Sequence, residues 1–362
     1  MKKFIKGKEL SRLFYFKEVK PILDRYFPDL KYAAGLLGWG SEVLGFDTVM
    51  STDHNWGPRL QLLLPENRMY LKDKIDVKLS EMLPYTFMGY STNFKRYKNT
   101  TKPTTRLPEI KKAGKIDHFV QIYGIREFFI KHVNFDPYKE IKSVDWLQFP
   151  EQRLLTIKEG SIFHDDIGLN KIKTKFDYYP KDIWLYMLAS QWKRISQEEA
   201  FIGRTASVGD ELGSRIIAAR MVQELMKLCF LMERKYAPYS KWFGTAFQKL
   251  KSSKRLTKIL EAVIASKSFR ERENNLSKAY EEVARMHNKS GITKKLSAKV
   301  SGFHDRPFKV IDAERFTNMI LKEIKDRDIR RLKPIGGVDQ FISSTDLLED
   351  AELIEKLKGL YL

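Results

Sequence analysis

A glycine-rich loop followed by a short acidic segment is the part of this sequence best suited to chemistry. The loop is Gly38-Trp39-Gly40-Ser41, and Asp53-His54-Asn55 begins twelve residues after Ser41. Glycines let backbone amides approach phosphate oxygens, and the Ser41 hydroxyl can donate a hydrogen bond to one of them. Positions two apart in an extended segment point the same way, so residues 53 and 55 are expected to face the same cations. The pattern predicts a site for a nucleoside triphosphate and its Mg²⁺ ions.

Asn55 stands where such a pair would carry its second acid. An amide oxygen can coordinate Mg²⁺, but it removes one negative charge from a site that holds dications. The sequence therefore leaves open a slow enzyme, an inactive one, and an engineered Asp-to-Asn replacement that traps a bound substrate.

The elements that must position these residues alternate between helices and strands. Helical spacing of apolar residues predicts helices over 9–26, 72–83 and 125–132. The apolar run 60–64 and the alternating run 116–122 predict strands. Residues 90–114 are polar, without periodicity, and are predicted to form an exposed loop.

The pattern changes near residue 143, after which long helical repeats dominate. This change predicts an α+β protein, with an N-terminal α/β domain over 1–142 that holds a short mixed sheet, and an all-α domain over 143–300. Residues 301–362 are predicted to form a C-terminal segment. Within it, residues 338–346 are expected to pack back on the N-terminal domain or the cleft between the domains, because a glycine turn precedes a mixed apolar and polar stretch.

Bulk composition narrows the class of protein. The net charge of +20 indicates a polyanionic partner or a lysine-rich surface with no partner. Cys229 is the one cysteine, which excludes an internal disulfide and a cysteine-based metal site. No apolar run reaches the length of a membrane span and the N-terminus lacks the apolar core of a signal peptide, so a cytoplasmic protein without a membrane partner is expected.

Several motifs together resemble the DUF4037 family of the DNA polymerase β-like nucleotidyltransferase superfamily. They are spread over most of the chain: GSEVLGFD at 40–47, STDHNWGPR at 51–59, YPKDIWL at 179–185, QEEAFIGR at 197–204, GDELGS at 209–214, RKYAPYSKWFG at 234–244 and VDQF at 338–341. The resemblance implies a nucleotidyltransferase-like N-terminal domain. It also implies Mg²⁺-dependent transfer of a nucleoside monophosphate from a triphosphate to an acceptor.

The resemblance assigns roles to individual residues. Gly40 and Ser41 match the phosphate-binding loop, and Asp53 matches the first metal ligand. Asn55 falls at the second ligand, where it is both a metal-site and a catalytic candidate beside Asp53. The third ligand should lie on the strand over 116–122, with Asp117 and Gln121 as candidates; Asp117 would keep a charge and Gln121 would not.

Other candidates come from the basic and helical parts of the sequence. Arg59, Arg204 and Lys241 are candidates to contact phosphate or base, with surface ion pairs as the equal alternative. Glu199 is a candidate base for activating an acceptor hydroxyl, by analogy with antibiotic nucleotidyltransferases; a solvated or ion-paired helix face is the alternative.

Two functions follow, and a purely structural protein is the least expected third. The first is a Mg²⁺-dependent nucleotidyltransferase that uses a nucleoside triphosphate and an unidentified acceptor, which is a small molecule, a protein or RNA. The second is a catalytically degraded module of the same fold that binds a nucleotide or RNA. The sequence identifies neither the base nor the acceptor.

Overall fold

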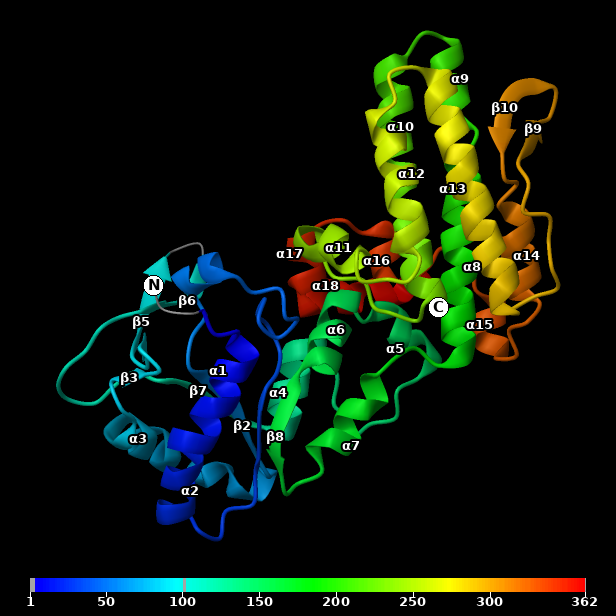
Figure 1. The fold of residues 1–362 in the computed structure, drawn as a ribbon. Coiled ribbons are helices and arrows are strands. Elements are labelled where there is room, and N and C mark those ends of the chain that lie inside the picture. The colour runs from blue at the N-terminus through cyan, green and yellow to red at the C-terminus, as the bar shows by residue number, and fades with distance from the viewer. Residues whose placement is uncertain (1–3, 100–101, 362) are drawn as a thin grey trace. The chain divides into compact units, whose positions relative to one another are not determined.

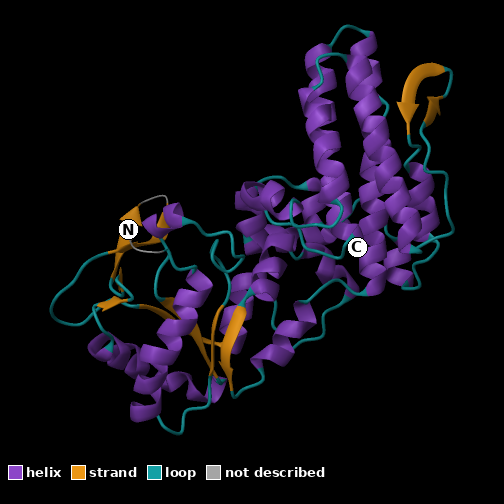
Figure 2. Ribbon diagram, viewed as in Figure 1, coloured by secondary structure: helices purple, strands orange, loops and turns teal. Residues whose placement is uncertain are grey.

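The computed structural model describes residues 4–99 and 102–361, which fold into two compact units. The N-terminal unit comprises Met1–Glu140 and Arg153–Asp177, and the helical unit comprises Ile141–Gln152 and Tyr178–Leu362. The predicted α+β class is confirmed, because one small mixed sheet lies in the first unit and long helices dominate the second (Figure 2). The segment Arg153–Asp177 belongs to the first unit although it lies within the range predicted as helical domain.

A four-stranded sheet in the order β7-β2-β1-β8 forms the centre of the N-terminal unit (Figure 1). β2 (Arg59–Leu64) pairs in parallel with β7 (Phe119–Gly124) and antiparallel with β1 (Ala33–Leu36). β8 (Ser161–Asp165) pairs antiparallel with β1 on its other side. The predicted strands over 60–64 and 116–122 correspond to β2 and β7.

One face of this sheet is apolar and covered by helices. Leu60, Leu62 and Leu64 of β2 share a buried cluster with Val120 and Ile122 of β7. The same cluster contains apolar residues of three helices: α1 (Gly7–Phe14), α2 (Lys20–Tyr26) and α3 (Lys72–Met82). α1 and α2 are joined by a π-helical turn, so the predicted helix over 9–26 is continuous but irregular.

The opposite face of the sheet carries polar side chains. Because side chains alternate along a strand, Arg59 and Gln61 of β2 point away from the apolar cluster, as do Gln121 and Tyr123 of β7. α4 (Ile125–Val133) follows β7 directly and packs against both β7 and β2. A buried face with this many polar groups requires internal hydrogen-bond partners.

One prediction about local structure is wrong, and one strand was not predicted. Residues 90–114 are not a loop: β4 (Tyr90–Ser91) pairs with β3 (Thr86–Phe87), and β5 (Phe94–Asn99) pairs with β6 (Lys102–Pro108). Apart from the buried Phe94, the strands of this second hairpin are mainly polar in sequence, FKRYKN and KPTTRLP, and do not show the apolar alternation of a half-buried strand. β8 was missed for another reason, since short helices flank its five residues and hide its alternation.

Four long helices, α8, α10, α12 and α13, run alongside one another in the helical unit (Figure 1). They span Lys181–Glu198, Glu211–Met232, Ser253–Ala265 and Phe269–Ser290. Asp210 and Ser268 cap α10 and α13 by accepting hydrogen bonds from the backbone amides of Gly213 and Glu271. In the described part of the chain, no helix is long and apolar enough to cross a membrane.

Shorter elements complete the two units. The hairpin of β9 (Ser301–Phe303) and β10 (Arg306–Val310) belongs to the helical unit. The remaining α-helices are α5 (Ser143–Gln148), α6 (Glu151–Glu159), α7 (Leu169–Lys173), α9 (Phe201–Ser207), α11 (Ser240–Phe247), α14 (Glu314–Leu321), α15 (Arg327–Arg331), α16 (Val338–Phe341), α17 (Thr345–Glu349) and α18 (Ala351–Lys356).

The C-terminal segment is anchored on α8 inside the helical unit. The buried Gln340 amide donates hydrogen bonds to the Met187 carbonyl and to Gln191 Oε1, both at 2.9 Å, and its own oxygen accepts the Gly337 amide at 3.1 Å. Tyr361 adds a hydrogen bond to the Gly336 carbonyl at 2.8 Å. The segment is therefore an ordered part of this unit, while its packing on the N-terminal domain or the cleft stays a prediction.

Replacing Gln340 by Ala should destabilise the helical unit. The change leaves the buried Met187 carbonyl, Gln191 Oε1 and Gly337 amide without these partners, and each unpaired buried group costs roughly 1–3 kcal/mol. We expect the free energy of unfolding to fall by about 2–4 kcal/mol in urea titrations. Ser343→Ala at the exposed neighbouring position is the control; equal stability of both variants would show that Gln340 does not anchor the segment.

A buried pair of carboxyl groups joins the C-terminal segment to the start of α6. The Glu151 amide donates to Asp339 Oδ2 at 2.8 Å, and Glu151 Oε2 accepts the Ala237 amide at 2.6 Å. The nearest cation, Lys227, donates to the Asp339 carbonyl and not to its carboxylate. Burial raises the pKa of both groups, and it raises that of Glu151 to about 8 with the neighbouring Asp339 charge adding to the shift.

The pair should make the stability of the helical unit depend on pH. Because its pKa is higher in the folded state, the folded state binds the proton more tightly than the unfolded chain, where glutamate titrates near pH 4. This contribution is complete below about pH 4 and is lost as the pH rises through about 8. Glu151→Gln keeps an oxygen for the Ala237 amide but does not titrate. We expect the decrease in unfolding free energy between pH 5 and pH 8.5 to be smaller in this variant by on the order of 2–4 kcal/mol. Parallel pH profiles of the two proteins would contradict this.

Candidate functional site

In the loop after β1, glycines stand at positions where any side chain would collide with neighbouring residues. Gly38 has φ 75° and lies against the His132 ring of α4. Gly40 has φ 140°, and a Cβ atom there would collide with the Arg59 guanidinium and the Glu42 carboxylate. Trp39, half exposed, lies against His132 with ring centroids 4.5 Å apart and the ring planes inclined by 56°. Successive backbone amides of a loop with glycines at positive φ are one arrangement that binds phosphate.

A buried ion pair beneath the loop fixes its shape. Arg59 Nε donates to Glu42 Oε1 at 2.6 Å, and Arg59 Nη2 donates to the Trp39 carbonyl at 2.6 Å. Both side chains are almost fully buried. Arg59, predicted to contact a nucleotide, thus has its guanidinium engaged in holding the loop. The sequence analysis passed over Glu42, although an acid between Ser41 and the apolar Val43 and Leu44 was a signal for a buried partner.

The segment with Asp53 and Asn55 is not extended, so the expected alignment of their side chains is wrong. Residues Val49–Asp53 form a 3₁₀ helix, which starts with reciprocal hydrogen bonds between Thr48 and Ser51. Asn55 then adopts φ 50°, a left-handed conformation that Asn tolerates. Asp53 is 68% exposed, and its Oδ1 atom lies at hydrogen-bond distance, 2.8 Å, from His54 Nδ1. Asp53 therefore offers its carboxylate to solvent.

Asn55 joins this segment to the β5–β6 hairpin. The backbone amide of Asn55 donates to the Arg106 carbonyl, and the side-chain Oδ1 of Asn55 accepts the backbone amide of Arg106, both at 2.8 Å. The side-chain oxygen proposed as a metal ligand is thus already a hydrogen-bond acceptor. The structure gives Asn55 a positioning task that the sequence did not reveal.

The two candidates for the third ligand also have protein partners. Gln121 Oε1 accepts Gln61 Nε2 at 3.1 Å, and Gln121 Nε2 donates to the Tyr123 hydroxyl at 3.0 Å. Asp117 lies 3.4 Å from Arg106 Nη1 and 3.7 Å from Arg96 Nε. The uncharged side chain of Gln121 is therefore already hydrogen-bonded to protein groups, and the Asp117 carboxylate lies near two arginines.

The guanidinium groups of Arg59 and Arg106 both lie against the Phe119 ring, where β2 and β7 begin, and Asn55 and Asp117 contact Arg106. Arg59 and Phe119 are paired at the start of β2 and β7, and Gln61 pairs with Gln121 one step further along. The guanidinium of Arg59 lies 5.4 Å from the Phe119 ring centre and that of Arg106 lies 4.6 Å from it. Of the predicted residues, Gly40 lies against the Arg59 guanidinium, Asn55 and Asp117 contact Arg106, and Gln121 follows Phe119 two residues later in β7. Ser41 follows Gly40, and its carbonyl accepts the Phe46 amide at 2.9 Å.

Two acids and a histidine of this region are each held in contacts within the protein. Glu42 and Asp117 each face arginine, and burial holds the pKa of His132 at about 3, with Lys131, Arg153 and Arg59 adding to the shift, so that ring is neutral. Nowhere in residues 4–99 and 102–361 do three His, Cys, Asp or Glu side chains gather as metal ligands. The Asp53 carboxylate is 68% exposed, and its partner is the neighbouring His54 ring and not an arginine or a lysine.

The other three candidates belong to the helical unit. Glu199 accepts the amides of Ile311 and Ala313 at 2.8 and 3.0 Å, and burial raises its pKa to about 7. The Arg204 guanidinium lies over the Phe201 ring, and the Lys241 ammonium lies over the Trp242 ring. Glu199 is therefore buried, in contrast to the solvated helix face that was its alternative.

Comparisons with known proteins bear on family and fold. Residues 146–243 match the family model of DUF4037, a domain of unknown function, which confirms the resemblance to that family. The crystal structure of a nucleotidyltransferase-like protein from Exiguobacterium sibiricum 255-15 is similar at 10% identity and a TM-score of 0.33, over 82% of each chain. A likeness of this degree carries no argument about the site. No curated protein matches the chain.

Breaking the buried ion pair should destabilise the N-terminal unit. Glu42→Gln removes the charge opposite Arg59 and leaves the buried guanidinium uncompensated, which typically costs about 3–5 kcal/mol. We expect this loss in chemical denaturation, together with faster amide hydrogen exchange at residues 38–41. Glu9→Gln, in the exposed Glu9–Arg12 pair, should cost under about 1 kcal/mol. A similar small cost for both variants would show that the pair does not hold the loop.

Proposed function

We propose that the N-terminal unit binds a nucleoside triphosphate, with its phosphates at residues 38–41. Mg²⁺ would arrive with the phosphates, and Asp53 would be its one protein carboxylate. Three features support this: an open glycine loop, two arginines flanking Phe119, and a carboxylate turned to solvent.

One observation favours a binding module over an efficient transferase. At the second and third ligand positions, Asn55 Oδ1 accepts the Arg106 amide and Gln121 Oε1 accepts the Gln61 amide group. Both groups are neutral and already bonded, so the site lacks the anionic oxygens that hold two Mg²⁺ ions during phosphoryl transfer. Nucleotide binding without fast turnover is the function that this arrangement supports best.

Transfer of a nucleoside monophosphate is the second candidate, supported by the free carboxylate of Asp53. Its acceptor, whether a small molecule, a protein or RNA, is not indicated by the residues around Phe119. Calorimetric titration with ATP, GTP, CTP and UTP, with and without Mg²⁺, tests binding, and pyrophosphate release tests transfer. Absence of binding by every triphosphate would overturn the proposal, whereas binding with rapid pyrophosphate release would replace the first candidate by the second.

Asn55→Asp should strengthen the Mg²⁺ dependence of triphosphate binding. Aspartate also tolerates φ near 50° and can still accept the Arg106 amide, so the change adds an anionic oxygen without disturbing the segment. We expect ATP affinity in the presence of Mg²⁺ to rise about tenfold, which corresponds to about 1.4 kcal/mol. Asp53→Asn should abolish the difference between titrations with and without Mg²⁺.

Asn318→Asp, an exposed position on α14, controls for the added charge. If Asn55→Asp binds Mg²⁺-ATP no better than Asn318→Asp, position 55 is not near the metal. If Asp53→Asn retains full Mg²⁺ dependence, Asp53 is wrongly assigned, while nucleotide binding itself stands.

A further inference from the structure

One stretch of the helical unit carries basic side chains and no acidic ones. Residues 234–258 contain eight Lys or Arg residues and no Asp or Glu, whereas the whole chain has 66 basic and 46 acidic residues. All eight basic side chains are exposed. The stretch covers the turn after α10, the whole of α11 and the start of α12, so this charge belongs to the helical unit alone.

The fold gathers the three parts of this stretch around one end of α10. Glu233, which follows the last residue of α10, accepts the backbone amides of Lys251 and Ser252 with its two carboxylate oxygens, both at 2.8 Å. The turn before α12 therefore lies beside the turn after α10. α11 packs against the same end of α10, since the centroids of the Phe230 and Phe243 rings are 5.4 Å apart. Residues distant in sequence thus place their positive charges in one region of the surface.

Three lysines follow one another along the start of α12. Lys251 lies just before the helix, and Lys254 and Lys258 lie one turn apart on its exposed face. We call these three residues the lysine row. Within the described chain, no Asp or Glu forms an ion pair with them. The adjacent Arg255, in contrast, pairs with Glu282 at 3.2 Å.

These charges do not stabilise the helices that carry them. The first turns of α11 and α12 contain no acid, and they contain Lys241 and Lys254 instead. The N-terminal end of a helix carries a partial positive charge, which favours acids there and disfavours cations. Like charges four residues apart, as at Lys254 and Lys258, also repel each other. The stability of α11 and α12 therefore does not account for the lysines, whereas binding of a polyanion does.

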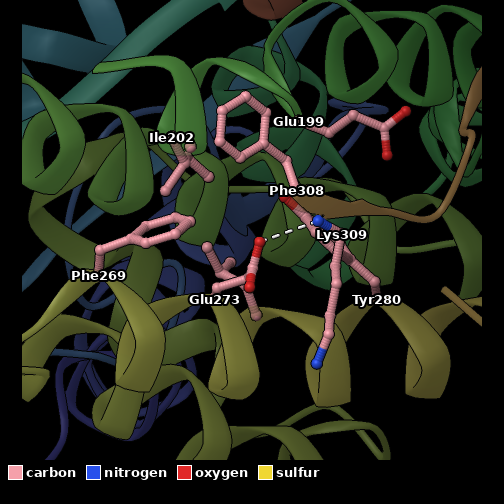
Figure 3. A pocket seen from close by; sticks show the side chains of 9 residues that line it. Glu199, Ile202, Phe269, Glu273, Tyr280, Phe308 and Lys309 are labelled. Atoms are coloured by element: carbon pink, nitrogen blue, oxygen red, sulfur yellow. Dashed lines mark hydrogen bonds between the residues drawn. The ribbon is translucent and has the colours of Figure 1, made fainter. Parts of the chain in front are cut away.

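Basic side chains in other parts of the helical unit have acceptors within the protein. Arg272 on α13 pairs with Glu211 on α10 at 2.8 Å. At β10, the Lys309 ammonium lies 3.2 Å from Asn274 Oδ1, and the Lys309 backbone amide donates to the Glu273 carboxylate at 2.9 Å (Figure 3). The lysine row has no comparable acidic neighbour, so its charge is available to a partner in solution.

Two aromatic rings in the same stretch favour a nucleic acid over other polyanions. Tyr239 and Trp242, at the start of α11, are both partly exposed. The Lys241 ammonium lies 5.1 Å from the centre of the Trp242 ring, so a cation and a ring face occur together. Surfaces that bind single-stranded nucleic acid combine cations for the phosphates with aromatic rings on which unpaired bases stack.

We propose that residues 234–258 bind single-stranded nucleic acid, with the lysine row at the phosphates and Trp242 against a base. Phosphates and base faces are common to RNA and DNA, so both are expected to bind. A duplex keeps its bases stacked on one another, and an acidic polypeptide offers charge without bases. The surface does not depend on nucleotide binding by the N-terminal unit.

The experiment uses the full-length protein and fluorescently labelled oligo(U) and oligo(dT) of roughly 12 nucleotides. We expect fluorescence anisotropy to give dissociation constants on the order of 10⁻⁵ M near physiological salt, with affinity decreasing as salt increases. Similar binding of the two oligomers supports the shared chemistry, and a preference for one identifies the natural source. Binding of poly-glutamate or of a duplex as tight as that of both oligomers would show a surface that recognises charge alone and would overturn the proposal.

Variants locate the surface. Combined replacement of the lysine row by Gln should weaken oligo(U) binding at least tenfold and reduce the slope of log affinity against log salt by about 2. Because these lysines oppose the dipole of α12, their loss should not lower the free energy of unfolding, which separates lost binding from lost folding. Trp242→Leu should weaken binding about tenfold and leave the salt slope unchanged.

The matched control removes three positive charges from another part of the helical unit. It replaces three exposed lysines on and after α13 by Gln, namely Lys278, Lys289 and Lys294. This variant should bind oligo(U) as tightly as the unaltered protein. Retained affinity after replacement of the lysine row, or an equal loss in the control, would overturn the assignment to residues 234–258.

Discussion

The buried pair of Arg59 and Glu42 is the constraint on which the candidate site depends. Separating the two side chains would leave an unpaired charge buried, at a large cost in free energy. The pair therefore fixes the loop after Ser41 to β2. Since the same guanidinium holds the Trp39 carbonyl and leans on Phe119, it also ties the loop to β7. The conformation of residues 38–41 is therefore fixed by the Arg59–Glu42 pair inside the unit and does not depend on a bound nucleotide.

This arrangement divides the charges of the site unevenly. Glu42 and Asp117 each form an ion pair with an arginine. Asp53 has no arginine partner and lies on an exposed 3₁₀ turn. The sheet face carries amides at Gln61 and Gln121, which bond to each other and to the Leu37 amide and Tyr123. A polar but neutral face can accompany phosphates, but it does not concentrate the negative charge that a pair of metal ions needs.

The sequence predicts the parts of this structure that depend on apolar periodicity. The run that became β2 and the long helices α8, α10 and α13 were predictable, because their side chains fill the cores. The β5–β6 hairpin was not, since its strands are held by backbone pairing and by Asn55. Site residue types could be predicted, but the partners of Arg59, Asn55 and Gln121 lie 17 to 60 residues away in sequence. Such pairings follow from tertiary structure and not from local pattern.

Those pairings also show which side chains positions 55 and 121 can accept. Asn55 and Gln121 each use an oxygen as an acceptor, and a carboxylate oxygen could serve in the same place. At position 121 the Tyr123 hydroxyl already accepts the Lys131 ammonium at 2.9 Å, so it can turn its own hydrogen toward an acid. The surrounding hydrogen bonds thus fit acids as well as amides. Packing alone therefore does not require an amide at either position.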